Sequence, residues 1–145
     1  MNVRATTRFR GERSAVPSAR AFVRHAIRPA KPTLDTAERL ELATAEACNN
    51  AILHASGSAF TVSVEVDDEH IAVTVSDDGV GFEPPTHPSM PAPQAMGHRG
   101  LPLMQALVDE VDVTSDGCGT TVVLSQGLSP GGAGTPATAP VTVDG

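Results

Sequence analysis

Two short patterns in this sequence combine residue types that bind ligands or take part in reactions. Glu46 and Asn50 are separated by three residues in a segment that we expect to be helical. Their side chains would therefore lie one above the other on a single helix face. Apolar residues fill much of the rest of this helix, so a carboxylate and an amide there need polar partners or a water-lined pocket. The alternative, two polar residues on an exposed helix face, fits this pattern equally well.

The second pattern is Asp77-x-Gly79-x-Gly81-Phe82, which directly follows a predicted strand. Glycines at this spacing either let the backbone pass close to a ligand or provide the positive φ of a plain turn. The acidic spacing of an EF-hand loop and its closing glutamate are missing, which disfavours a calcium site. Later, Gly97-His98-Arg99-Gly100 precedes a predicted helix and either starts it or directs amides at an anion. Gly119-Thr120-Thr121 is compatible with a simple hairpin turn.

The elements that must position these residues are helices and short strands in alternation. Polar and apolar residues alternate in the predicted strands, and capping residues and prolines delimit the predicted helices. We expect a strand at 3–9 and hairpins at 60–75 and at 111–124, the second around Asp116-Gly117. We expect helices from about Pro17 to Pro29 and at 100–111. A third helix would be capped by Asp35 and Glu38 and would stop at Ser56-Gly57. This order predicts an α+β fold, a two-layer sandwich in which helices cover one face of the sheet.

Composition limits both the size of the protein and its range of partners. A chain of 145 residues and 14.9 kDa with 40% hydrophobic residues fits one globular domain. The net charge of -7 and the lack of a basic stripe argue against nucleic acid as a direct partner. Arginines gather in the first 28 residues and form either a surface for an acidic protein or a solvated face.

Cysteine content and hydropathy point to a cytoplasmic protein. The two cysteines, Cys48 and Cys118, are too few for a disulfide framework and wrongly spaced for zinc. No apolar run approaches the ~20 residues that span a bilayer, and the N-terminus lacks a signal-peptide hydrophobic region.

Two segments are expected to lack regular structure. Residues 83–96 contain five prolines, which are incompatible with helix or strand. From residue 126 onward, Gly, Pro, Ser, Thr and Ala dominate, and we predict a disordered tail at 126–145 after a domain at 1–125.

Taken together and in order, the patterns resemble those of the Bergerat-fold ATPases, the histidine-kinase-like superfamily. The segments ATAEACNNAILHA, VTVSDDGVGFEPP and GTTVVL look most like the anti-sigma-factor serine/threonine kinases, over roughly residues 3 to 125. The resemblance implies a mixed, mostly antiparallel sheet covered by helices on one face. It also implies ATP and Mg²⁺ as ligands.

The resemblance also implies a role for each matching residue. Glu46 would be the catalytic base, and Asn50 would coordinate Mg²⁺ that bridges the phosphates. Asp77 would accept a hydrogen bond from the adenine amino group, and Thr121 would lie near the adenine. The remaining nucleotide-binding positions would be Gly79 and Gly81 beside the nucleotide, with Gly97, Arg99, Gly100 and Leu101 at the phosphates.

At the level of the whole protein, the resemblance implies an anti-sigma factor that phosphorylates an antagonist protein and switches partners. Its partners would be a sigma factor and a small domain phosphorylated on Ser or Thr, and the protein would be a homodimer without membrane contact. Two departures concern the phosphates: His98 stands where a glycine is common, and Pro102 removes an amide from the helix start. The alternative is a non-catalytic nucleotide-binding module that regulates a transcription or signalling partner.

Overall fold

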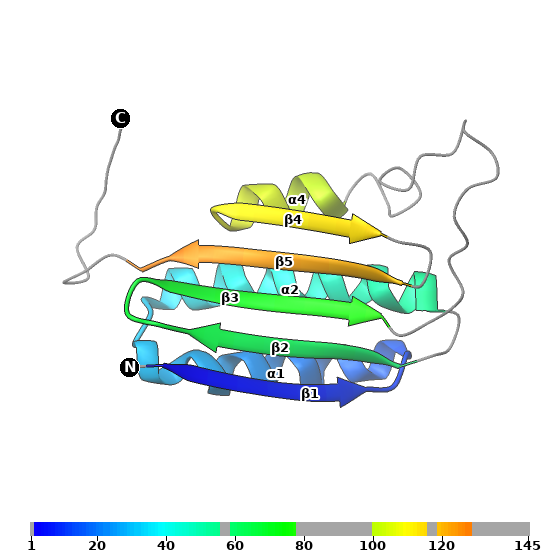
Figure 1. The fold of residues 1–145 in the computed structure, drawn as a ribbon, viewed down its shortest axis with the longest axis horizontal. Coiled ribbons are helices and arrows are strands. Elements are labelled where there is room, and N and C mark those ends of the chain that lie inside the picture. Colours follow the sequence, from blue (N-terminus) through cyan, green and yellow to red (C-terminus); the bar gives the residue numbers. More distant parts are fainter. Residues whose placement is uncertain (1, 56–58, 78–99, 116–118, 129–145) are drawn as a thin grey trace.

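The computed structural model describes residues 2–55, 59–77, 100–115 and 119–128, which form a five-stranded sheet and its covering helices (Figure 1). The elements are, in chain order, β1 (Val3–Phe9), α1 (Val16–Ile27), α2 (Leu34–Ala55), β2 (Phe60–Val66), β3 (His70–Asp77), α4 (Gly100–Leu107), β4 (Glu110–Ser115) and β5 (Thr120–Gly127). The strand order is β1-β2-β3-β5-β4. The predicted α+β class is therefore confirmed.

Every pairing between these five strands is antiparallel, so the described sheet is not mixed. The β2–β3 pair is the predicted hairpin, and β5 adds to the free edge of β3. This addition places the end of β3 beside the start of β5, where Ser76 pairs with Thr121. Segments far apart in the sequence thus meet at one end of the sheet.

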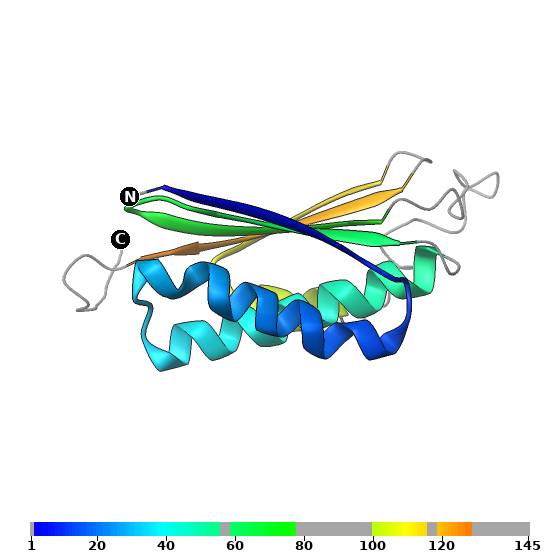
Figure 2. The same ribbon diagram turned by 90° about the horizontal axis from the view of Figure 1, so that it is seen from below.

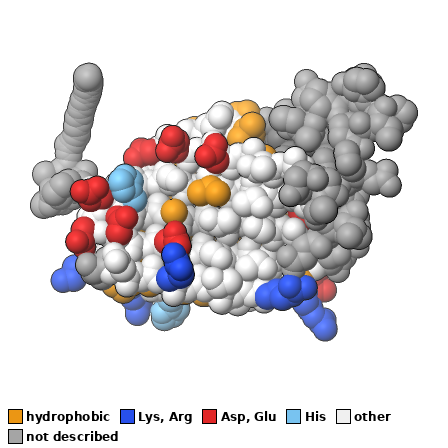
Figure 3. Space-filling view, in the orientation of Figure 1, with side chains coloured by type: hydrophobic (Ala, Val, Ile, Leu, Met, Phe, Trp, Pro, Cys, Tyr) orange, Lys and Arg blue, Asp and Glu red, His pale blue; other side chains and the backbone are white. Residues whose placement is uncertain are grey.

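The helices lie on one face of the sheet, and the core lies between the two layers (Figure 2). Alternate residues of β2 and β3 are buried because successive strand side chains point to opposite faces. Phe60, Val62 and Val73 face the helices and are fully buried, as are Leu40 and Ala47 of α2. The other sheet face is uncovered in the part of the chain that the structure describes (Figure 3).

Two predicted helix boundaries were wrong. Thr33, not Asp35, caps α2: its Oγ1 accepts a hydrogen bond from the N–H of Thr36 at 3.1 Å. Asp35 already lies inside the helix, where its carboxylate pairs with Arg39 one turn later at 2.9 Å.

The helix predicted for residues 100–111 ends at Leu107, since Glu110 begins β4 and pairs with Ser125 of β5. The alternating Val111 and Val113 are strand residues.

Several expectations lie outside the described residues. They are the proline run at 83–96, the turn at Asp116-Gly117, and the tail beyond residue 128. Strand β5 continues through Gly127, past the predicted domain end at residue 125. The Gln126 side chain explains why, since its Oε1 accepts a hydrogen bond from the N–H of Asp109 at 3.2 Å.

Burial keeps Cys48 in its neutral thiol form. The residue is fully buried in the core, and loss of solvation raises the pKa of its thiol to about 12. Among the described helices, none has both the length and the apolar character needed to cross a membrane.

Candidate functional site

Helix α2 carries both candidate residues of the first pattern, and Asn50 lies where this helix meets β3 and β5. Asn50 is buried, with 7% of its surface exposed, and Glu46 is half-buried. The separation of four residues aligns them along the helix axis. Small core residues, Ala43 and Ala47, lie on the neighbouring face of the same turns and are fully buried. Glu46 and Asn50 therefore form a polar stripe at the edge of the hydrophobic core.

Asp77 is the last residue of β3, and its side chain points to the helical layer. It is buried, at 6% exposure, and its Oδ2 accepts a hydrogen bond from the backbone N–H of Thr120 at 3.2 Å. The bond joins the end of β3 to the start of β5. A buried carboxylate would be costly without such a donor. The start of β5 therefore also orients this carboxylate.

Gly119 is required for this close approach. A Cβ atom added there would lie 2.5 Å from the carbonyl oxygen of Asp77, well inside contact distance. Sequence reasoning treated Gly119 as a turn glycine only and gave no role to Thr120. The alternation of buried Thr120, Val122 and Leu124 along β5 was the signal that could have identified it.

A small pocket lies between α2, β3 and β5, and it is too narrow in this structure to admit a water molecule. Its polar lining consists of Asn50, Asp77 and Thr120, and its apolar lining consists of Ala47, Ala51, Val75 and Val122. The structure thus brings Asn50 and Asp77 to one pocket, although they are far apart in the sequence. The pocket forms where α2 carries the small side chains of Ala47 and Ala51.

The side-chain nitrogen of Asn50 is the unusual atom of this pocket. Its Nδ2 is buried and forms no hydrogen bond with any described residue. Buried amides are nearly always hydrogen-bonded, because an unpaired one costs about 1–3 kcal/mol. An unpaired polar group that borders a pocket is typical of a site that receives a polar ligand.

The predicted position of Thr121 requires a correction. Its side chain lies on the uncovered sheet face, where its Oγ1 is 3.3 Å from Oγ of Ser76. Thr120 faces the pocket instead, because neighbouring strand residues point to opposite faces. Thr120 and not Thr121 therefore lines the pocket.

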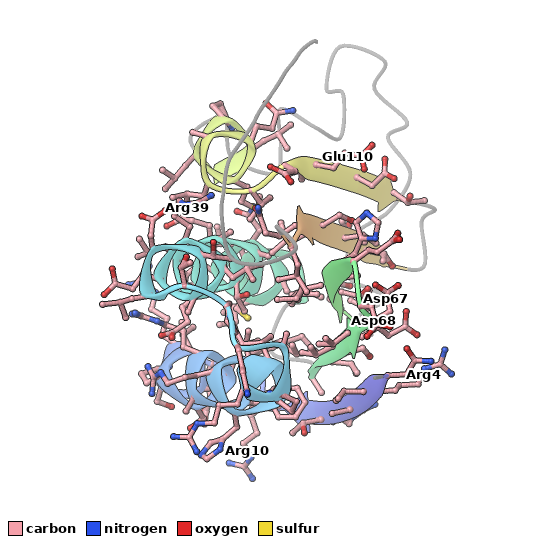
Figure 4. All side chains as sticks on the ribbon, turned by 90° about the vertical axis from the view of Figure 1, so that its left-hand side faces the viewer. Arg4, Arg10, Arg39, Asp67, Asp68 and Glu110 are labelled. Carbon is pink, nitrogen blue, oxygen red and sulfur yellow. The ribbon has the colours of Figure 1, made fainter. Side chains whose placement is uncertain are left out.

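The structure describes only some of the glycines and other residues that were predicted to lie beside the nucleotide and its phosphates. Gly100 and Leu101 begin α4, whereas Gly79, Gly81, Gly97 and Arg99 lie outside the described residues. Arg39 of α2, labelled in Figure 4, joins the two helices: its Nη1 donates to the carbonyl oxygen of Leu107 at 2.8 Å. Arg39 thereby fixes the C-terminal end of α4 against α2.

The residues present fit a purine nucleotide with a bound divalent ion. Asp77 provides a hydrogen-bond acceptor in the lining of this pocket, which suits an amino-substituted ring. Asn50 provides an amide whose oxygen suits Mg²⁺, an ion that takes few protein ligands when phosphates supply the rest. In the described part of the chain, no group of three or more His, Cys, Asp or Glu residues gathers into an all-protein metal site.

Comparison with known protein families agrees with this geometry. The sequence model of the histidine kinase-like ATPase domain matches residues 9–126. The anti-sigma F factor of Pasteuria penetrans is 35% identical over 103 residues, which cover 63% of this chain and 68% of that protein. The serine-protein kinase RsbW of Bacillus subtilis (strain 168) is 33% identical over 110 residues, which cover 67% of this chain and 68% of that kinase.

A solved structure has the same fold. The crystal structure of the RsbU and RsbW domains of Rv1364c from Mycobacterium tuberculosis superimposes with a TM-score of 0.67 at 19% sequence identity. The match covers 95% of this chain and 34% of that longer chain.

Proposed function

Since the chain belongs to the histidine kinase-like ATPase family, with anti-sigma factors and serine-protein kinases among its relatives, we propose that it is an ATP-binding anti-sigma factor and protein serine/threonine kinase. It binds a sigma factor and phosphorylates a small antagonist protein, so that phosphorylation decides which partner is held. One observation carries the proposal: the unpaired amide of Asn50 borders the pocket of Asp77, one helical turn from Glu46.

Adenine recognition is assigned to Asp77. Its carboxylate lines the pocket and is an acceptor group, and an adenine amino group donates where guanine presents a carbonyl. The site would therefore select adenine over guanine. Gly79 and Gly81 would keep the following backbone close to the nucleotide.

Phosphate and metal binding are assigned to Asn50 and the start of α4. When bound, ATP with Mg²⁺ supplies the phosphoryl group for transfer. Asn50 would hold the metal ion through its amide oxygen. Gly97, Arg99, Gly100 and Leu101 would hold phosphate oxygens through backbone amides, the helix dipole and one guanidinium.

Glu46 is assigned the role of general base. It has no ion pair or hydrogen bond with a described residue, and it is only half-buried, so a substrate hydroxyl can approach it. Its carboxylate accepts the proton of the serine or threonine hydroxyl as that oxygen attacks. Such a base accelerates proton transfer by about 10² to 10⁴.

The cellular setting follows from the same family membership. We place the protein in the cytoplasm as a homodimer whose partners are proteins. A net charge of -7 disfavours direct contact with nucleic acid or an anionic membrane surface.

The decisive experiment compares Glu46→Ala and Asn50→Ala with the wild type in ATP binding and phosphotransfer. The acceptor is the protein recovered by pull-down in the presence of ATP and Mg²⁺. Glu46→Ala should keep near-normal ATP affinity and lose transfer by about 10² or more, because a base acts only as the proton leaves. Asn50→Ala should lose both, because it removes a metal ligand.

Glu38→Ala is the matched control, since Glu38 is an exposed glutamate of the same helix. It should leave both measurements unchanged. If the wild type transfers no phosphate to any recovered partner, or if Glu46→Ala transfers at the wild-type rate, the kinase assignment is wrong. The protein would then be a nucleotide-binding regulatory module.

A further inference from the structure

Helix α4 is short, and few of its side chains pack into the core. It has eight residues, and an isolated helix of that length is marginal in water. Among its side chains that the structure describes, Met104 alone is fully buried. Leu101 and Leu107 are half-buried, and the other described side chains of the helix are exposed. Apolar packing therefore stabilises the position of α4 only modestly.

Polar contacts hold the C-terminal end of α4 from two neighbouring elements. Arg39 of α2, labelled in Figure 4, donates from Nη1 to the carbonyl oxygen of Leu107 at 2.8 Å. From β5, the Oε1 of Gln126 accepts a hydrogen bond from the N–H of Asp109 at 3.2 Å, directly after the helix. The Asp109 carboxylate also accepts a bond from the N–H of Gly127 at 2.9 Å. The end of α4 is thus fixed to both α2 and β5.

The guanidinium of Arg39 is itself oriented by its own helix. Its Nε donates to Oδ2 of Asp35 at 2.9 Å, and its Nη2 donates to Oγ1 of Thr36 at 3.4 Å. These two contacts leave Nη1 directed at the carbonyl of Leu107. A positive charge at the C-terminal end of a helix is also favoured by the helix dipole. Arg39 is therefore an oriented bridge from α2 to the end of α4.

We propose that Arg39 is a positioning residue for the phosphates of the bound nucleotide. This role rests on the proposed function, in which the start of α4 binds the phosphates. The first and last residues of an eight-residue helix are about 11 Å apart, so a tilt of about 10° at the fixed end moves the N-terminus by roughly 2 Å. A shift of this size takes a backbone amide out of hydrogen-bond distance of a phosphate oxygen. Arg39 acts at one end of the helix, and its effect is felt at the other.

Adenine recognition should not depend on this bridge. It is assigned to Asp77, whose carboxylate is oriented by the N–H of Thr120 at the start of β5. Arg39 instead contacts α4 through the carbonyl of Leu107. The two parts of the nucleotide therefore depend on different contacts. This difference distinguishes a positioning role from a general loss of stability, which would weaken binding of both parts.

The test compares the affinity of the full-length protein for ATP with Mg²⁺ and for adenosine, by equilibrium titration at a temperature at which every variant is folded. Arg39→Met should weaken ATP binding about 5- to 10-fold, the effect of losing one net hydrogen bond. Adenosine binding should stay within about 2-fold of the wild type, because contacts that are far apart act independently. Arg39→Lys keeps a positive charge and a donor, so its ATP affinity should return to within about 3-fold of the wild type.

Two control variants separate the bridge from ion pairing in general. Arg4→Met removes an exposed arginine of β1 that pairs with Glu65 at 2.7 Å. Asp35→Ala removes the ion pair within α2 and retains the donor that reaches Leu107. Each should change the ATP affinity by less than about 2-fold, because exposed ion pairs contribute little. An effect of Asp35→Ala as large as that of Arg39→Met overturns the bridge to α4.

Gln126→Met tests the second contact at the end of α4, and it decides in the same way if Arg39→Met does not fold. It removes the acceptor of the Asp109 N–H and should show the same selective loss of ATP affinity. Unchanged ATP affinity, or equal weakening of ATP and adenosine, overturns the positioning role and leaves the proposed function intact. A wild type that binds ATP no more tightly than adenosine overturns both the positioning role and the phosphate assignment. Phosphotransfer is not measured here, so a failure of the kinase assignment remains distinguishable.

Discussion

At the level of single residues, the tightest constraint in the described site is the contact between Gly119 and Asp77. A hydrogen in place of a Cβ lets β5 start directly against the carbonyl of Asp77. The N–H of Thr120 can then reach the Asp77 carboxylate at 3.2 Å. The contact that limits residue 119 to glycine also orients the carboxylate to which we assign adenine recognition.

Gly119→Ala should therefore destabilise the protein and weaken ATP binding together. The added methyl group would lie 2.5 Å from a backbone oxygen, and relief requires movement of β3 or β5. Overpacking of this kind costs about 1–3 kcal/mol. Thermal unfolding and ATP titration would measure the two effects.

Gly127→Ala, at the other end of β5, is the matched control. There the new Cβ would lie 3.2 Å from Oδ2 of Asp109, the end of a side chain rather than a backbone atom. Its effect should be under about 1 kcal/mol. Equal destabilisation by the two substitutions would contradict the role given to Gly119.

At the level of elements, an ion pair between α1 and α2 changes the interpretation of the N-terminal arginines. Glu41 of α2 is buried at 6% exposure and accepts two hydrogen bonds from Arg24 of α1, at 2.9 and 2.7 Å. Arg20 lies 3.6 Å from the same carboxylate. These two arginines therefore hold the helices together, and charge reversal there would disturb the fold as well as any partner surface.

We expect Arg24→Ala to lower the melting temperature more than Arg28→Ala does, because Glu41 would lose its bidentate partner while remaining buried. A second substitution, Glu41→Leu, should restore part of the loss by removing the unpaired charge. Thermal unfolding of the two single variants and the double variant measures this. If Arg24→Ala and Arg28→Ala have the same melting temperature, the ion pair contributes nothing to helix packing.

At the level of the whole molecule, ligand binding should appear as increased stability. ATP with Mg²⁺ at ~100 times its Kd should add about 2.7 kcal/mol to the free energy of unfolding. For a domain of this size, the melting temperature should rise by roughly 5 to 10 °C. GTP should cause little change, because Asp77 offers an acceptor to an amino group that guanine lacks at that position. Equal shifts with both nucleotides would contradict the adenine assignment.

The amino-acid sequence by itself determined most of the secondary structure and the fold class. Alternation in β2 and β3 and helical spacing in α2 are local patterns, and each reflects burial of one face. The stripe of Glu46 and Asn50 was also visible, because positions four apart on a helix always align. Segment ends were less accurate: Thr33 and Asp35 are both acceptable caps, and the structure shows that Thr33 accepts the capping hydrogen bond whereas Asp35 pairs with Arg39.

Only the tertiary structure decided which strands pair and which side chains from distant segments meet. The addition of β5 to β3 is a pairing across more than forty residues, and it alone brings Thr120 rather than Thr121 to Asp77. The ion pair of Arg24 with Glu41 exists because α1 packs on α2. Local spacing carries no information on which strands become neighbours, since many orders bury the same apolar residues.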